Sequence, residues 1–329
     1  VPPGKRIEWS YRLLANRRGV FVLQFVYLRL HTKGGFWVRL LKRKVESTIH
    51  VYPDLKQLAE YALLARTNRL SLIGVRRNRK IGQDNNFERL KDYTDGDNYR
   101  HIDWRSTAKR NRLTVKQFQS DQSQRVIFLV DCGRMMTNEH HALSLVDYAL
   151  NASLMLSYVA LQQRDAVGAM FFSDRVHTYI SPRGGKSQMN RLLHAGFDQF
   201  PNAVQSGFDT AFLHFSQRCN KRSLVVLITN VIDEVSANQI SAYMRNLTQR
   251  HLPLLVLLRD HRLFDFADYT DPTPSVLYRS AAAAQILTWR NDVIRRLERH
   301  GVLTLDLFPE QLTSGLVNKY LDVKARHLL

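Results

Sequence analysis

The feature that most constrains the fold is the alternation of apolar strands and amphipathic helices along the part of the chain after Gln124. The expected strands are 126–131, 166–172, 176–180, 224–229, 254–258 and 302–307, and the expected helices are 141–163, 187–200, 209–219, 236–250, 281–300 and 310–321. This pattern predicts an α/β fold with a doubly wound, mainly parallel sheet between two layers of helices. The short link before strand 176–180 predicts an antiparallel strand at one sheet edge.

The chain of 329 residues is long enough for more than one domain and, at 44% hydrophobic content, for a sizeable core. We divide it into a small β-rich module (1–54), a bridging helix with a polar segment (55–121) and the α/β domain (122–329). In the module, strands are expected at 11–14, 19–23 and 25–30, and the Gly34-Gly35 pair marks a break. Helical spacing of apolar residues predicts the bridging helix at 55–70.

The polar segment contains an unusual run of acids, bases and an indole. Its residues of interest are Gly74, Arg76, Tyr93, Asp95, Gly96, Asp97, Arg100, Ile102, Asp103, Trp104 and Lys116. With the apolar strand that ends at Asp131, this run resembles the signature of the bacterial domain of unknown function 58 family (DUF58). The resemblance implies a von Willebrand factor type A (vWA)-like fold for the α/β domain and extends over nearly the whole chain.

Members of that family commonly lie near genes for MoxR-type AAA+ ATPases, and they typically carry hydrophobic membrane segments upstream of the region seen here. The resemblance therefore implies an adaptor for such an ATPase at the cytoplasmic face of the cell membrane. It also implies a membrane anchor before Val1, which is not a Met. The basic residues near the start of the chain suit the cytoplasmic side of a membrane.

The signature allows two compatible interpretations. In the functional one, the crowded acids, bases and indole form a recognition surface or an active constellation. In the structural one, Asp95-Gly96-Asp97 is a tight turn, Arg100 pairs with Asp97 or Asp103, and Trp104 anchors the loop to the sheet domain. A loop held by internal ion pairs is also a rigid recognition element, so we expect an interaction surface here.

Asp131 stands at the carboxyl end of a strand, where open α/β sheets bind ligands. Metal-binding vWA domains carry Asp-x-Ser-x-Ser at this point, but Gly133 and Met135 replace both hydroxyls here, and Asn230 replaces a common Asp. The threonine of the second loop aligns with either Phe208 or Thr210. We therefore expect a degenerate metal site that holds no ion tightly, although weak Mg²⁺ binding is conceivable, and that carries the Arg134 side chain at the cation position.

Composition favours anionic partners, because the formal net charge is +19. These partners include an anionic membrane surface, an acidic protein or, as an alternative function, nucleic acid. Nucleic-acid binding is the weaker expectation, because the basic residues are spread along the chain and form no known recognition motif. The two cysteines, Cys132 and Cys219, favour a reducing compartment.

No catalytic motif is complete in the sequence. The run Gly184-Gly185-Lys186-Ser187 lacks the spacing of a phosphate-binding loop, and Glu139-His140-His141 lacks the spacing of a zinc motif. No nucleophile has a base nearby in sequence. We therefore expect no enzymatic activity and no tightly bound cofactor, and predict a protein-interaction module.

Overall fold

The computed structural model describes residues 8, 10, 12–14, 18–31, 35–53, 86–94, 99, 102–119, 124–231, 233–268 and 274–329. Within these ranges, no helix combines the length and apolar character that crossing a membrane requires. The expected helix 55–70 lies outside the described residues.

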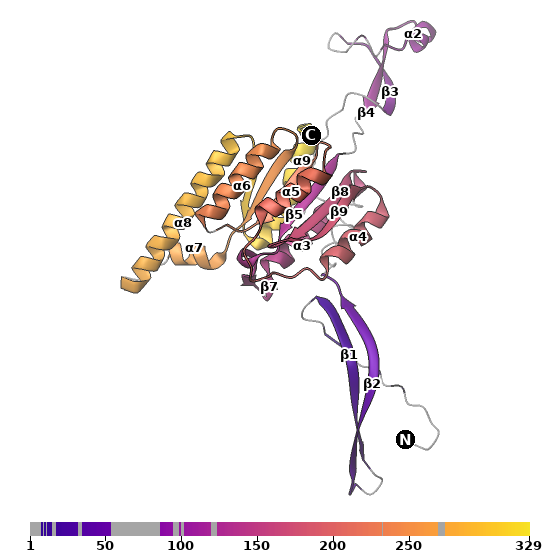
Figure 1. Ribbon diagram of the computed structural model, residues 1–329. Helices are drawn as coiled ribbons and strands as arrows, with labels where there is room; N and C mark the ends of the chain where they lie inside the picture. The colour runs from indigo at the N-terminus through magenta and orange to yellow at the C-terminus, as the bar shows by residue number, and fades with distance from the viewer. Residues whose placement is uncertain are drawn as a thin grey trace.

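A six-stranded sheet forms the centre of the α/β domain (Figure 1). Its strands are β5 (Arg125–Asp131), β8 (Ala166–Phe172), β9 (Val176–Arg183), β10 (Leu224–Thr229), β11 (Leu252–Leu258) and β12 (Leu303–Leu307). They lie in the order β12-β11-β10-β5-β8-β9. All neighbours are parallel except β9, which pairs antiparallel with β8 at the edge. The predicted doubly wound, vWA-like sheet and its antiparallel edge strand are confirmed.

Helices cover both faces of the sheet because every central strand is apolar on both sides. The helices are α3 (Leu145–Gln162), α4 (Lys186–Gly196), α5 (Phe208–Arg218), α6 (Glu234–Leu247), α7 (His261–Asp268), α8 (Pro274–Arg299) and α9 (Leu312–Ala325). Val126, Phe128 and Val130 of β5 pack in one core with α3, α4 and α9. Ile127 and Leu129 face the other core, which α5, α6 and α8 complete.

Several helical segments differ from the expectation. Residues 141–144, expected as the start of a helix, instead belong to a hairpin of β6 (Glu139–His140) and β7 (Leu143–Ser144). His141 and Ala142 have positive φ angles of 48° and 61°, which suit a tight hairpin turn and no helix. The helix begins only after Ser144, whose side chain forms a capping box with Asp147. Helix α7 was not predicted, and α8 begins before the expected residue 281.

The N-terminal β-rich part is a long antiparallel hairpin of β1 (Gly19–His31) and β2 (Val38–Val51). The two strands expected at 19–23 and 25–30 form one strand with a register shift between Leu23 and Phe25. The expected strand at 11–14 is not seen at the described residues 12–14. The hairpin projects away from the helical layers, with its base near α4 (Figure 1).

Arg18 and Tyr52 connect the base of this hairpin to the α/β domain. The Arg18 guanidinium donates to the carbonyl oxygen of Gly196 at 2.8 Å and forms an ion pair with Asp147. The Tyr52 hydroxyl lies 3.1 Å from Nδ1 of His194. Because Arg18 is buried, its charge is shielded from water and these contacts fix where the hairpin begins.

The signature segment contains a second hairpin of β3 (Asn86–Asp92) and β4 (Thr114–Gln119), with α2 (Trp104–Arg110) between the two strands. Two short 3₁₀ helices, η3 (Arg134–Met136) and η4 (Pro309–Gln311), follow β5 and β12 at the carboxyl edge of the main sheet. Both therefore lie where ligand sites occur in α/β folds.

Candidate functional site

The Asp131 carboxylate is enclosed at the carboxyl end of β5, where it is 1% exposed. One oxygen, Oδ1, accepts from the backbone N–H of Gly133 at 2.8 Å and from the Ser206 hydroxyl at 2.6 Å. The other, Oδ2, accepts from the Thr229 hydroxyl at 2.6 Å. Three neutral donors from three segments thus satisfy the carboxylate and hold the ends of β5 and β10 together.

Ser206 belongs to this site although the sequence did not predict it. Of the two residues expected at the second-loop position, Phe208 is buried in the core and Thr210 is exposed. The loop instead presents Ser206, and a Cβ atom built on Gly133 would lie only 2.1 Å from its Oγ. The hydroxyl that the Asp-x-Ser-x-Ser pattern places at position 133 is therefore supplied from a loop distant in sequence.

Asn230, the next residue after Thr229, is also buried. Its amide donates to the carbonyl oxygen of Met135 at 3.3 Å, while its Oδ1 accepts from Nη1 of Arg290 at 3.1 Å. Arg134 is exposed, and the hydrogen bonds that Asp131 accepts come from other residues, so the placing of Arg134 at the cation position stays a prediction. The buried cation beside Asn230 is Arg290 from α8, which also donates to the carbonyl oxygen of Leu258 and to Asp306, at 2.8 Å each.

Burial dominates the acid-base behaviour of this region. It raises the pKa of Asp131, against the lowering effect of the hydrogen bonds from Ser206, Thr229 and Gly133. Burial, together with the neighbouring Asp131 charge, also raises the pKa of Cys132 to about 12. The thiol therefore stays protonated at neutral pH and packs as an apolar side chain.

These contacts determine how well a metal ion fits. Asp131, Ser206 and Thr229 offer a carboxylate and two hydroxyls, whereas a hard cation such as Mg²⁺ takes about six oxygen ligands. The oxygen of Asn230 already accepts from a guanidinium. This set fits weak binding of a hydrated ion and does not fit a tightly held one, and its main effect is to connect the strand ends.

The signature residues are only partly described. Gly74, Arg76, Asp95, Gly96, Asp97 and Arg100 lie outside the described residues, and so does the proposed pairing of Arg100. Asp103 caps α2, because its Oδ1 accepts from the N–H groups of Arg105 and Ser106. Lys116 lies in β4 opposite Leu90. Asp103, one of the signature residues, thus has a clear structural role as the N-cap of α2.

The signature backbone closes on itself around the β3–β4 hairpin. Tyr93 donates from its N–H to the carbonyl oxygen of Leu113 at 2.8 Å, and Ile102 forms a bridge with Val115. Trp104 begins α2 with 68% of its surface exposed. The interpretation that Trp104 anchors this loop to the sheet domain is therefore wrong, and its indole faces solvent.

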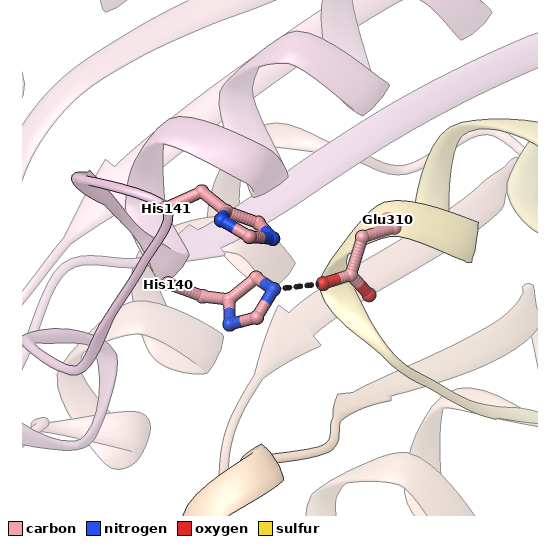
Figure 2. A group of neighbouring side chains, drawn as sticks. All are labelled: His140, His141 and Glu310. Carbon is pink, nitrogen blue, oxygen red and sulfur yellow. Dashed lines mark ion pairs between the residues drawn. The ribbon is translucent and has the colours of Figure 1, made fainter.

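A cluster of histidines around Glu310 forms the second notable group at the carboxyl edge of the sheet. Figure 2 shows the rings of His140 and His141 extending from one loop toward the Glu310 carboxylate. His140 forms an ion pair with this carboxylate, and Nε2 of His261 lies 3.1 Å from its Oε1. No local sequence motif predicts this group, because its members come from loops that only the fold brings together.

Comparison with known proteins identifies a family for more than half of the chain. The sequence model described as "Protein of unknown function DUF58" matches residues 89–267. A curated relative, the uncharacterized protein Rv1480 of Mycobacterium tuberculosis, is 21% identical over 181 residues, which are 54% of this chain and 56% of that protein. The chain thus spans about half the length of the curated relatives it matches.

Solved structures give weaker similarities. The conserved hypothetical protein BatB of Bacteroides thetaiotaomicron matches with a TM-score of 0.38 and 10% identity, over 62% of this chain and 99% of that one. An aerotolerance-related membrane protein of Bacteroides fragilis matches with a TM-score of 0.37 and 9% identity, again over 62% and 99%.

Proposed function

Because this chain belongs to the DUF58 family of proteins of unknown function, we propose that it is a non-enzymatic protein-interaction module. In this proposal it works at the cytoplasmic face of a membrane with an anionic surface, and its protein partner is a MoxR-type AAA+ ATPase. In the Asp131 region, the hydroxyls of Ser206 and Thr229 donate to a buried carboxylate that connects the ends of β5 and β10, which supports a structural and binding role for this region.

The observation that carries the proposal is the exposed apolar surface of the β1–β2 hairpin. Consecutive residues of β1, such as Val20, Phe21 and Val22, are all about half exposed, so both faces of the ribbon are open to solvent. At its far end, Phe36 and Trp37 are 89% and 78% exposed. An isolated two-stranded ribbon is marginally stable in water, and exposed apolar surface of this kind marks an interaction site.

Basic side chains accompany this apolar surface. Strands β1 and β2 carry Arg29, Arg39, Lys42, Arg43 and Lys44, against the single acid Glu46. Lys42 lies over the Phe25 ring, with its Nζ 3.7 Å from the ring centroid. Aromatic residues beside cations suit the interface of an anionic bilayer, where the ring enters the headgroup region and the charge faces the lipid phosphates.

The membrane part of the proposal is tested by co-sedimentation with vesicles. We expect the protein to pellet with vesicles that contain phosphatidylglycerol and to stay in solution with phosphatidylcholine vesicles. The double variant Phe36→Ser/Trp37→Ser should lose most of this binding, whereas Tyr278→Ser, which removes a ring that is 79% exposed on α8, should not. Equal binding of both variants to anionic vesicles would rule out the hairpin as the contact.

The partner is tested with a purified MoxR-type ATPase encoded by the same genome. Trp104 is the described signature side chain best suited as a contact, because exposed Trp residues often dominate binding energies. We expect Trp104→Ala to weaken the complex by 10-fold or more, and Tyr278→Ala to leave its Kd unchanged. A wild-type chain that forms no complex with the ATPase, with or without nucleotide, would exclude this partner.

A further inference from the structure

We propose that His140, His141 and Glu310 form a binding site for a divalent transition-metal ion of the zinc class, with His261 as a positioning residue. This site is separate from the Asp131 region and does not depend on the proposed partner. Imidazole nitrogens suit zinc, nickel or cobalt, whereas magnesium prefers oxygen ligands alone.

Three loops at the carboxyl edge of the parallel sheet assemble the group. His140 and His141 lie in the β6–β7 hairpin after β5, His261 opens α7 after β11, and Glu310 lies in η4 after β12. Loops that follow the parallel strands of one sheet lie at the same edge, which is where α/β sheets bind ligands. His141 has a positive φ and lies in the tight turn of the hairpin, directly after His140, so two adjacent residues supply both imidazoles.

The ligand atoms are close enough for one ion. One nitrogen of His140, one nitrogen of His141 and one oxygen of Glu310 all lie within 4.8 Å of one another. In a tetrahedral zinc site with bonds of about 2.0 to 2.1 Å, neighbouring ligand atoms stand about 3.3 Å apart. Small side-chain rotations close this difference, and the rings have room for them because His141 and Glu310 are exposed and His140 is half-buried. Figure 2 shows both rings directed at the carboxylate.

The charge state also suits metal binding. Burial acts to raise the pKa of Glu310, but its backbone N–H and the imidazoles of His261 and His140 outweigh burial, so the pKa lies below its ordinary value. A carboxylate oxygen and two imidazole nitrogens are ligands that zinc commonly takes, and metal binding requires the carboxylate form and the neutral imidazole form.

Stacking holds His261 in place beside the carboxylate. Its ring lies between those of His140 and Phe308, with centroids 4.3 Å from each. Its Nε2 is 3.1 Å and 3.3 Å from the two Glu310 oxygens. A ring fixed in this way orients the carboxylate toward the other two ligands, as residues around metal ligands commonly do.

Space for the remaining coordination positions is present next to the cluster. His140, His141 and His261 line a pocket of about 350 Å³ together with Asp260 and Asp265. Asp260 is held in turn by the Asn138 amide at 2.6 Å. Three protein ligands leave one position of a tetrahedral ion open, and this pocket would hold a water molecule or a side chain of another protein there.

The test is titration of zinc chloride into the chelator-treated protein, followed by calorimetry and by zinc content after gel filtration. We expect one saturable site per chain, with a Kd weakened at least about 100-fold in His140→Ala, His141→Ala and Glu310→Gln. His261→Phe, which keeps the stacking, should weaken binding about 10- to 100-fold, as expected for a residue that orients a ligand. His300→Ala, at an exposed histidine on a different loop, should bind as the wild type does.

Two readouts separate a lost ligand from a damaged fold. Each metal-free variant should melt at the wild-type temperature, because the replaced side chains are at least partly exposed. Cobalt(II) added in place of zinc should give the intense visible absorption of a tetrahedral site in the wild type, in His300→Ala and, at higher cobalt concentration, in His261→Phe. The three ligand variants should not give it. A wild-type chain without saturable zinc binding, or equal binding by Glu310→Gln and the wild type, would overturn the proposal.

Discussion

The hydroxyl of Ser206 occupies the space into which a side chain at Gly133 would extend. A Cβ atom at position 133 would lie 2.1 Å from the Ser206 Oγ and 3.1 Å from Oδ1 of Asp131. The two positions therefore constrain each other: either residue can present a hydroxyl to Asp131, but both cannot do so in this backbone. Gly133 donates its own N–H to Asp131, and its lack of a side chain leaves room for the Ser206 hydroxyl.

We expect Gly133→Ser to destabilise the α/β domain by about 1 to 3 kcal/mol, the usual cost of overpacking. The measurement is urea unfolding of the single variant, of Ser206→Ala and of the double variant. Since Ser206→Ala removes the atom that clashes, the double variant should be more stable than Gly133→Ser alone. The destabilisation of the double variant should therefore be smaller than the sum of the two single destabilisations. Additive effects of the two changes would contradict the shared space.

Titration of Asp131 should appear in the pH dependence of stability. Because burial raises its pKa in the folded state above the ordinary value of 3.8, the folded protein prefers the protonated acid. That preference contributes stability below the unfolded pKa, and the contribution is lost as pH rises through the folded pKa. Relative to Asp131→Asn, which does not titrate, the wild type should therefore lose stability from acid toward neutral pH. Urea unfolding of both proteins across this pH range measures the two free energies of unfolding. If the wild type gained stability relative to Asp131→Asn as pH rises, the pKa of Asp131 would be lowered in the folded state.

The apolar pattern was sufficient to predict the sheet because its central strands are buried on both faces. Strands 166–172 and 224–229 begin and end where expected, since a continuous apolar run flanked by polar residues has few alternatives in a parallel sheet. The 141–144 segment was predicted wrongly because its residues fit a helix by composition. The positive φ angles of His141 and Ala142 and the capping box at Ser144 together determine that α3 begins at Leu145.

Contacts across the carboxyl edge could not be predicted from local patterns. Ser206 is 75 positions from Asp131, and Arg290 is 60 positions from Asn230, so no spacing rule connects them. The sequence predicted that Asp131 lies at the carboxyl end of a strand, where ligand sites occur. The identity of the hydroxyl and of the cation near it depends on how the loops fold. The same holds for Glu310, whose histidine partners follow other strands.

Arg290 should be among the most sensitive positions of the α/β domain. It is 3% exposed and donates to Asn230, Val231, Leu258 and Asp306. Arg290→Met would leave these acceptors buried without their donor, and removing one partner of a buried pair costs about 3 to 5 kcal/mol. We expect the lower part of that range, because Arg259 also contacts Asp306, at 3.0 Å.

The control for this variant lies on the same helix. Arg295→Ala removes an exposed guanidinium from α8 and should change the free energy of unfolding by no more than about 0.5 kcal/mol. Thermal unfolding of both variants at one pH makes the comparison. Similar melting temperatures for Arg290→Met and the wild type would mean that water replaces the guanidinium without loss.

Arg18 determines how firmly the β1–β2 hairpin is held against the α/β domain. Its guanidinium contacts the Asp147 carboxylate and the carbonyl oxygens of Gly196 and Gln199, all from a buried position. Hydrogen bonds to charged groups contribute about 1.5 to 3 kcal/mol. We therefore expect Arg18→Ala to make local opening at the hairpin base easier by about 2 kcal/mol, which is about 30-fold in an opening equilibrium.

Hydrogen exchange of the amides of residues 20–23 measures this opening. The exchange rates should rise about 30-fold in Arg18→Ala, the factor that corresponds to an opening made easier by about 2 kcal/mol. Amides of the central strands β5 and β10 should keep their protection. Arg39→Ala, which removes an exposed guanidinium from β2, should leave all of these rates unchanged. If Arg18→Ala exchanged no faster at residues 20–23, the contacts of Tyr52 and Phe197 would be sufficient to hold the hairpin. If β5 exchanged faster as well, Arg18 would stabilise the whole domain and not the hairpin alone.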